Sequence, residues 1–181
     1  MRVLDKLRAR SYNGKKLLPT EDIAMSRIAA ENDLRNSGFL DRLIVLEQNT
    51  ATVQLAAEAL GVEPGRIAKT LSFIVRDEPV LIVFEGTARI DNAKFKQALG
   101  TKAKMIPPEQ VEALVGHVPG GVCPFGRKEN VPVYLDVSLK NFDPVYPAAG
   151  DDHTAVRLAL SELEAAMRPA GWVDVAKAAA E

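Results

Sequence analysis

The sequence predicts a mixed α/β domain, built as a mixed, largely antiparallel sheet or an open barrel surrounded by short helices. Apolar runs typical of buried strands are dispersed among stretches with helical periodicity. Their spacing is unequal, so the regular strand-helix-strand units of a doubly wound fold are not expected. The 181 residues, 47% hydrophobic and 26% charged, suit one globular domain.

The first elements are two helices with a strand between them. Thr20 is a good N-cap followed by two acidic residues, which predicts a helix over about 21–36. The apolar run 43–46 predicts a strand. A second helix is expected over 51–60, with Asn49 or Thr50 as its cap and Gly61 at its end.

The middle of the chain is expected to contribute a pair of strands and a helix. Pro64 and Gly65 predict a turn. Two apolar runs, 70–75 and 80–84, follow it and are separated by Arg76 to Pro79, which predicts a hairpin or neighbouring strands. The next helix is expected to start at Asp91 and to end at Gly100.

The last part of the chain is expected to alternate strands and helices. Pro107 and Pro108 favour the start of a helix over 109–115, which Gly116 ends. Ser161 is predicted to cap the terminal helix. The predicted strands are 103–106, 131–135, 155–158 and a weaker one at Val145.

Composition excludes several function classes. No apolar run approaches the roughly 18 residues of a membrane span, and no secretory signal follows the basic start, so a cytoplasmic protein is expected. One cysteine, Cys123, allows no intrachain disulfide, and with only His117 and His153 beside it we expect no metal site and no cofactor.

Charge is distributed unevenly along the chain. Residues 1–19 carry a net charge of +5 and the remainder, 20–181, carries −6. We interpret 1–19 as a basic arm, most simply a solvated tail, and 20–181 as one domain. A second basic cluster, and a basic pair after the glycine-rich stretch, could contact nucleic-acid phosphates or form an ordinary solvated surface. These residues are Arg89, Lys94, Lys96, Arg127 and Lys128.

The stretch from Gly116 to Gly126 contains four glycines and two prolines in eleven residues. Glycine allows close backbone approach and proline removes flexibility, so this composition indicates a stiff loop that presents main-chain N–H and C=O groups to a ligand. A tight connection between a helix and a strand is the alternative. The loop is neither a Rossmann nor a Walker motif.

Lys69 lies at the entrance to an apolar strand, where its ammonium group would be partly dehydrated and able to stabilise an oxyanion or hold a carbonyl. A surface lysine is the alternative. Asp136 and Ser138 end a later strand and offer a carboxylate and a hydroxyl on the same side. His117 and Cys123 suggest a base and a thiol nucleophile, although both residue types in such a loop are more often structural.

These motifs together resemble the YbaK/ProX/EbsC family of aminoacyl-tRNA deacylases, which is related to the editing domain of bacterial prolyl-tRNA synthetase. The resemblance covers about residues 22–168. It rests on the order and spacing of five segments, namely Ala56-Ala57, Leu60-Gly61, Ile67 to Leu71, Gly116 to Gly126 and Leu135 to Ser138.

The resemblance implies a YbaK-like mixed α/β fold and a trans-editing hydrolase that deacylates mischarged tRNA. The amino acid removed is expected to be small, such as Ala, Cys, Ser or Thr, and tRNA-Pro is a candidate for the tRNA. It implies catalytic roles for Lys69, Gly121 and Asp136. The expected partners are the aminoacylated end of tRNA and an aminoacyl-tRNA synthetase, with no membrane and no DNA. Substrate contacts are expected from Thr70, Gly120, Val122, Cys123, Pro124 and Ser138.

Two alternatives remain open at the level of sequence. One is a non-catalytic module that binds aminoacyl-tRNA or a synthetase, which the presence of Lys69 and Gly121 disfavours. The other is a small hydrolase that depends on Cys123 and His117. The Cys123-dependent hydrolase and the editing enzyme differ in what they predict for the substitution Cys123→Ala. It should abolish the activity of a thiol enzyme and leave the activity of an editing enzyme.

Overall fold

The structure is a computed structural model that describes residues 11–12, 15–16 and 20–177, and side chains from Met25 to Lys177. The predicted basic arm lies outside the described residues, apart from two short antiparallel strands, β1 (Ser11–Tyr12) and β2 (Lys15–Lys16). Within the described residues, no helix is long and apolar enough to cross a membrane.

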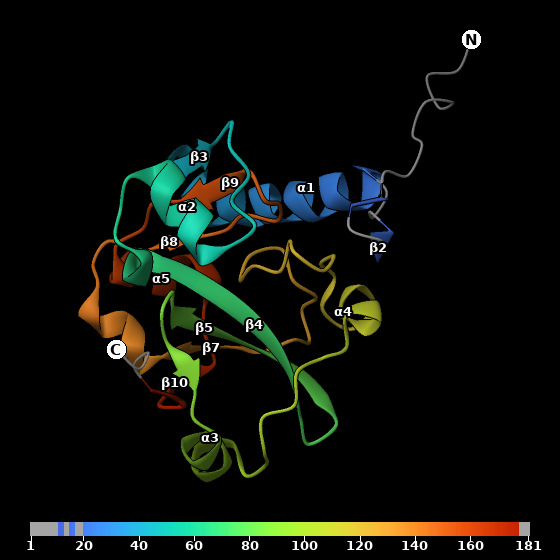
Figure 1. Cartoon of the computed structure of the whole chain (residues 1–181), viewed down its shortest axis with the longest axis vertical. Helices are drawn as coiled ribbons and strands as arrows, with labels where there is room; N and C mark the ends of the chain where they lie inside the picture. Colours follow the sequence, from blue (N-terminus) through green and yellow to red (C-terminus); the bar gives the residue numbers. More distant parts are fainter. Residues whose placement is uncertain (1–10, 13–14, 17–19, 178–181) are drawn as a thin grey trace.

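A five-stranded mixed sheet forms the centre of the molecule, in the order β10-β7-β5-β4-β8 (Figure 1). The predicted hairpin is its longest pairing, because β4 and β5 run antiparallel over eight residue pairs. The three other neighbour pairs of this sheet are parallel. Its strands are β4 (Ile67–Val75), β5 (Glu78–Glu85), β7 (Val133–Asp136), β8 (Tyr146–Pro147) and β10 (Gly171–Val173).

Two further antiparallel pairs border this sheet. The first joins β3 (Leu43–Val45) to β9 (Thr154–Val156), and the second joins β6 (Arg89–Ile90) to β11 (Ala176–Lys177). Parallel and antiparallel pairs coexist, so the mixed α/β architecture is confirmed.

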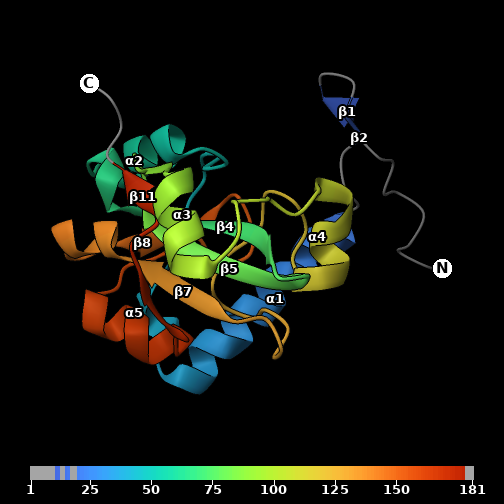
Figure 2. The same cartoon turned by 90° about the horizontal axis from the view of Figure 1, so that it is seen from below.

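Helices cover both faces of the sheet. They are α1 (Thr20–Ser37), α2 (Val53–Leu60), α3 (Asn92–Leu99), α4 (Pro108–Val115) and α5 (Leu160–Met167), with short 3-10 turns at Leu40–Arg42, Pro64–Arg66 and Val137–Asn141. Figure 2 shows α3 on one side of β4, β5 and β7 and α1 with α5 on the other.

The side chains of β5 explain this arrangement, because alternate residues of a strand point to opposite faces. Leu81 and Val83 belong to a core cluster that includes Leu34 of α1 and Leu163 of α5. Val80, Ile82 and Phe84 belong to a second cluster with Phe73 and with Phe95 of α3, where the Phe73 and Phe95 ring centroids are 5.1 Å apart. Because β5 is buried on both faces, its sequence is a continuous apolar run rather than an alternation of apolar and polar residues.

Several predicted boundaries agree with the structure. Helices α2, α3 and α4 end at Gly61, Gly100 and Gly116, each with a positive φ that glycine adopts without strain. Asp91 caps α3 as predicted, because its carboxylate accepts the Ala93 and Lys94 N–H groups.

Other local predictions were wrong. Ser161 lies inside α5, whose cap position is Ala159, and the Glu162 carboxylate accepts the Ala159 N–H at 2.9 Å. Thr52, rather than Asn49 or Thr50, caps α2. The predicted strand 103–106 makes only one bridge, from Met105 to Phe73 of β4. Five short strands, β1, β2, β6, β10 and β11, were not predicted at all.

Candidate active site

A cavity of about 410 Å³ opens beside β4. It is enclosed by the start of α2, by the segment from Met105 to Val111, by the glycine-rich loop, and by the chain between β8 and β9. Such a volume is typical of sites for small molecules, and most of the lining side chains are apolar. Polar groups reach it from Thr50, Thr52, Lys69, Thr70, Ser72, Tyr146, Asp151 and Thr154.

Lys69 on β4 lines this cavity, as the sequence predicted. Its ammonium group donates to the Gly86 carbonyl at 2.8 Å and to the Ala88 carbonyl at 2.5 Å. Gly86 is needed here, because a Cβ at this position would lie 2.0 Å from the Pro64 carbonyl oxygen. An ammonium has three N–H groups, so two fix the side chain in place and one stays available for a ligand.

Electrostatics tune the same lysine. Burial lowers the pKa of Lys69 from its ordinary value, while the nearby Glu85 carboxylate opposes this decrease and Arg89 adds to it. A partly dehydrated cation interacts more strongly with a developing negative charge than one in bulk water does.

The glycine-rich loop packs against α1. His117 is fully buried, with Nδ1 2.6 Å from the Ser26 hydroxyl and Nε2 2.8 Å from the Phe125 carbonyl oxygen. The Gly126 N–H donates to the Asp33 carboxylate at 3.0 Å. These contacts hold the loop at both ends, so it is stiff and presents its central residues to the cavity.

The predicted substrate contacts of this loop divide into two groups. Gly120 and Val122 line the large cavity, together with Thr70 of β4. Gly121 lines a smaller adjoining pocket of about 70 Å³, and its Cα lies close to the chain after β8, since a Cβ would be 2.6 Å from the Gly150 carbonyl oxygen. Cys123 and Pro124 are buried and line neither space.

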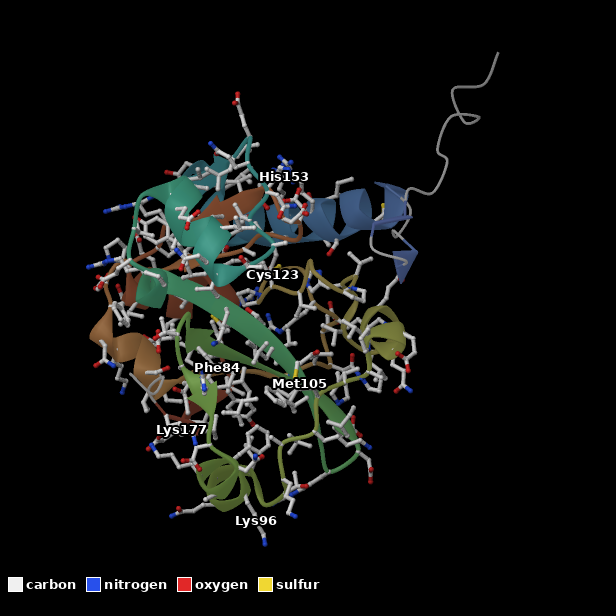
Figure 3. All side chains as sticks on the ribbon, viewed as in Figure 1. Phe84, Lys96, Met105, Cys123, His153 and Lys177 are labelled. Atoms are coloured by element: carbon white, nitrogen blue, oxygen red, sulfur yellow. The ribbon has the colours of Figure 1, made fainter. Side chains whose placement is uncertain are left out.

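Cys123 is a core residue within the loop (Figure 3). Its thiol donates to the Phe125 carbonyl at 3.2 Å, and burial raises its pKa to about 12. The pKa of His117, 3.7 Å away, is lowered by burial. A buried neutral thiol beside a structural histidine is inert, because the thiolate is the nucleophile. The structure therefore contradicts the Cys123-dependent hydrolase.

Asp136 and Ser138 lie outside both spaces, contrary to expectation. The buried Asp136 carboxylate accepts the Ser138 N–H at 2.9 Å and the Val175 N–H at 2.8 Å, which joins β7 to the C-terminal segment. The Ser138 hydroxyl accepts the Glu85 N–H at 3.3 Å. Both residues form main-chain contacts and line neither space, so a direct catalytic role for Asp136 receives no geometric support.

The predicted tRNA-binding residues also separate. Arg127 donates to the Pro124, Val131 and Met167 carbonyls, and Lys128 donates to the Ala113 carbonyl. Lys94 pairs with Asp174 at 2.8 Å. Arg89 and Lys96 are exposed near and on α3, where Figure 3 shows Lys96 at the edge of the molecule. Arg127 is thus a structural residue, Lys128 is exposed but is bound to the Ala113 carbonyl, and the exposed cations around α3 are Arg89 and Lys96.

Asp151 is a cavity-lining residue that was not among the predicted site residues. It lies between β8 and β9, is 8% exposed, and lines both the large cavity and the smaller pocket. The sequence feature that could have indicated this residue is the run Gly150-Asp151-Asp152-His153, but such a composition is common in ordinary turns. In the described part of the chain, no group of three or more His, Cys, Asp or Glu residues could hold a metal ion.

The fold is that of an aminoacyl-tRNA editing domain, a class of hydrolase that removes an amino acid from tRNA. The family model described as "Aminoacyl-tRNA editing domain" matches residues 47–166, and the chain belongs to this family. The resemblance inferred from the motifs is confirmed, and with it the class of enzyme, an aminoacyl-tRNA deacylase.

Relatives include proteins of similar length and larger synthetases. The uncharacterized protein YwhH of Bacillus subtilis is 48% identical over 132 residues, which is 72% of this chain and 84% of that protein. "Putative Cys-tRNA(Pro)/Cys-tRNA(Cys) deacylase EbsC" of Enterococcus faecalis is 33% identical over 110 residues, or 60% and 67% of the two chains. A proline–tRNA ligase of Shouchella clausii is 29% identical over 131 residues, 72% of this chain but 23% of the ligase.

A solved structure has the same fold. The crystal structure titled "a putative trans-editing enzyme for prolyl tRNA synthetase" superposes with a TM-score of 0.75 at 30% identity. The similarity covers 84% of this chain and 97% of that one. The YbaK-like fold is therefore confirmed.

Proposed function

We propose that the chain acts in trans on mischarged tRNA, from which it removes a small amino acid, with Ala, Cys, Ser and Thr as candidates and tRNA-Pro as a candidate tRNA. The position of Lys69 carries this proposal. Lys69 lines the large cavity, and its ammonium group is anchored by two carbonyls and has one N–H left for a substrate. Similarity to chains whose names refer to Cys-tRNA and to trans-editing supports the choice of substrate.

In the proposed mechanism, water attacks the carbonyl carbon of the aminoacyl ester and loses a proton, the ester bond to the terminal ribose breaks, and the ribose oxygen that leaves takes up a proton. The free N–H of Lys69 donates to the substrate carbonyl, where negative charge develops, or to the terminal ribose. Main-chain groups of Gly120 and Val122 orient the ester and the water. The ester is already reactive, so positioning and charge stabilisation supply the catalysis, and the buried thiol takes no part.

The small side chains around the cavity support a small amino acid as substrate. Ala56, Ala68, Ala148 and Ala155 line it, together with larger apolar residues that exclude water. A difference of one methyl or hydroxyl group in such a pocket is worth about 1 to 3 kcal/mol, so the lining side chains set the preference. We also propose a partner, an aminoacyl-tRNA synthetase that would supply the mischarged tRNA.

Deacylation of a panel of alanyl, cysteinyl, seryl and threonyl tRNAs tests the proposal. We expect the wild type to hydrolyse at least one of them and Lys69→Ala to reduce kcat by about 100-fold, the loss typical of removing one oxyanion donor. Lys96→Ala, an exposed cation on α3, is the matched control and should keep its kcat.

Two outcomes would contradict the proposal. Full activity of Lys69→Ala would exclude the lysine from the mechanism. A wild type that binds the tRNAs and hydrolyses none would instead favour the non-catalytic binding module.

A further inference from the structure

The charges inside the large cavity form a pair of opposite sign. Among the described residues that line it, only Lys69 and Asp151 are charged. Lys69 lies on β4, and Asp151 lies in the loop between β8 and β9. That loop starts beside Lys69, because β8 pairs in parallel with the start of β4, with Pro147 opposite Ala68, and Asp151 follows four residues later. A ligand in this cavity meets a cation on a strand and a carboxylate on the loop that follows the neighbouring strand.

Asp151 has one oxygen engaged and one nearly free. Its Oδ1 accepts the Thr154 hydroxyl at 2.6 Å and the His153 N–H at 3.0 Å. Its Oδ2 has one partner, Nη1 of Arg27, at the long distance of 3.4 Å, and the same arginine makes a shorter contact of 2.8 Å with Glu31. Oδ2 therefore keeps the capacity to accept a strong hydrogen bond.

The surrounding backbone holds this carboxylate in place before any ligand arrives. Gly150 packs so closely on α1 that a Cβ would be 2.5 Å from the Ser26 carbonyl oxygen, and Gly121 packs equally closely on Gly150. Burial of a charge costs free energy unless the charge is paired or hydrogen-bonded, and the long contact with Arg27 pairs the Asp151 carboxylate only weakly. Such a preorganised and incompletely satisfied carboxylate is suited to bind a cationic group.

We propose that Asp151 binds the α-ammonium group of the aminoacyl ester while Lys69 binds its carbonyl or ribose end. This inference rests on the proposed function and assigns Asp151 a substrate-binding role in it. Every aminoacyl-tRNA carries an amino group next to the ester carbonyl, so a cavity with a cation and a carboxylate matches both ends of that unit. The consequence is selectivity for esters with a free amino group over esters that lack its charge.

The test uses esters that differ only in this group. Each amino acid of the panel is compared with its α-hydroxy analogue on the same tRNA, lactyl for alanyl and glyceryl for seryl, since a hydroxyl has nearly the size of the amino group and no charge. Rates are divided by the uncatalysed hydrolysis rate of the same ester. We expect the wild type to prefer the aminoacyl ester in kcat/KM by about tenfold or more, the scale of one charge-assisted hydrogen bond.

Asp151→Asn is the informative variant. The asparagine carbonyl can still accept the His153 N–H and the Thr154 hydroxyl, so the turn is kept, while an NH₂ group replaces the free acceptor. We expect the preference for the aminoacyl ester to fall to near unity through loss of activity on that ester alone. Asp152→Asn is the matched control on the same loop, since this carboxylate contacts Asn49 and His153 and does not line the large cavity.

The outcomes distinguish this inference from the proposed function. Asp151→Asn with the wild-type preference, or with equal losses on both esters, overturns the role of Asp151 while leaving the deacylase intact. Lys69→Ala should lower both rates and keep their ratio. A wild type that is inactive on every ester overturns the proposed function and this inference with it. Circular dichroism and thermal unfolding of Asp151→Asn identify any loss that comes from the fold.

Discussion

At the scale of single residues, identical side-chain chemistry has opposite consequences in different surroundings. Lys69 and Lys128 both donate to main-chain carbonyls, but only Lys69 lines the large cavity. Asp136 and Asp151 are both buried carboxylates, but both oxygens of Asp136 accept backbone N–H groups whereas one oxygen of Asp151 is nearly free. Location and remaining hydrogen-bonding capacity separate site residues from structural ones.

Cys123→Ala should leave deacylation within about twofold of the wild type, because the thiol lines neither pocket and is held neutral. It should lower the free energy of unfolding by about 1 kcal/mol at pH 7, the usual scale for removing a small buried group. Paired measurements of kcat/KM and urea unfolding check both statements. A loss of activity that exceeds the loss of folded protein would reopen the thiol mechanism.

The same thiol makes stability depend on pH at the alkaline end. The unfolded chain ionises Cys123 near its ordinary pKa of about 8.5, whereas the pKa is about 12 in the folded protein. The contribution of the buried thiol to the free energy of unfolding is therefore complete below the pKa of the unfolded chain. It is lost as the pH rises towards the pKa of the folded protein. Above pH 9 we expect the stability advantage of wild type over Cys123→Ala to shrink by up to about 1.4 kcal/mol per pH unit. A constant difference between pH 7 and 10 would show that the thiol is not buried.

At the scale of elements, the glycine-rich loop packs against other segments and also forms part of the cavity wall. His117 and Asp33 attach it to α1, and Gly121 allows it to touch the chain that carries Asp151. The loop thus connects three segments that are distant in sequence. Its composition predicted stiffness and an exposed backbone, and the cavity-lining positions of Gly120 and Val122 agree with that prediction.

Gly121→Ala should therefore reduce stability and activity together. The added methyl would lie 2.6 Å from the Gly150 carbonyl oxygen, a backbone atom that cannot turn aside, and overpacking of this kind costs about 1 to 3 kcal/mol. Gly171→Ala is the control, because its methyl would meet only the Tyr134 ring at 4.0 Å. Thermal unfolding and deacylation of both variants check this, and equal behaviour of the two would show that the loop can shift.

Sequence patterns predicted helix ends and the hairpin well, because these features depend on residues that are close together in the chain. Glycine ends of α2, α3 and α4, the Asp91 cap and the β4–β5 hairpin all depend on neighbours in sequence. The cap of α5 is local as well, because the Glu162 carboxylate accepts the Ala159 N–H three residues earlier, and the prediction chose the wrong local signal in Ser161. The segment 103–106 depends on tertiary contacts, because it forms only one bridge to β4.

At the scale of the whole molecule, the charge distribution bears on how tRNA would approach the cavity. Exposed Arg89 adjoins the Lys69 end of the site closely enough to lower the pKa of Lys69, and Lys96 projects from α3. Arg127 is turned inward and is not available for phosphates. The exposed cations around α3 are therefore the stronger candidates for holding the acceptor end.

The double variant Arg89→Ala/Lys96→Ala should weaken tRNA binding and make it less sensitive to salt. Each lost phosphate contact reduces the slope of log affinity against log salt by about 0.7 to 0.9, so a decrease of about 1.5 is expected if both contacts exist. The kcat at saturating tRNA should change little. An unchanged slope would place the tRNA elsewhere, and removal of residues 1–19 in the same assay would then test the basic arm.

The sequence by itself determined the fold class, the chief secondary elements, the family and the two features at the centre of the site, Lys69 and the glycine-rich loop. These follow from periodicity, capping residues and motif spacing, which are local properties of a chain. Only the tertiary structure decided that Asp151 rather than Asp136 lines the cavity and that Cys123 is core. Burial and hydrogen-bond partners depend on residues 100 or more positions away, such as Arg27 for Asp151, and no local pattern encodes them.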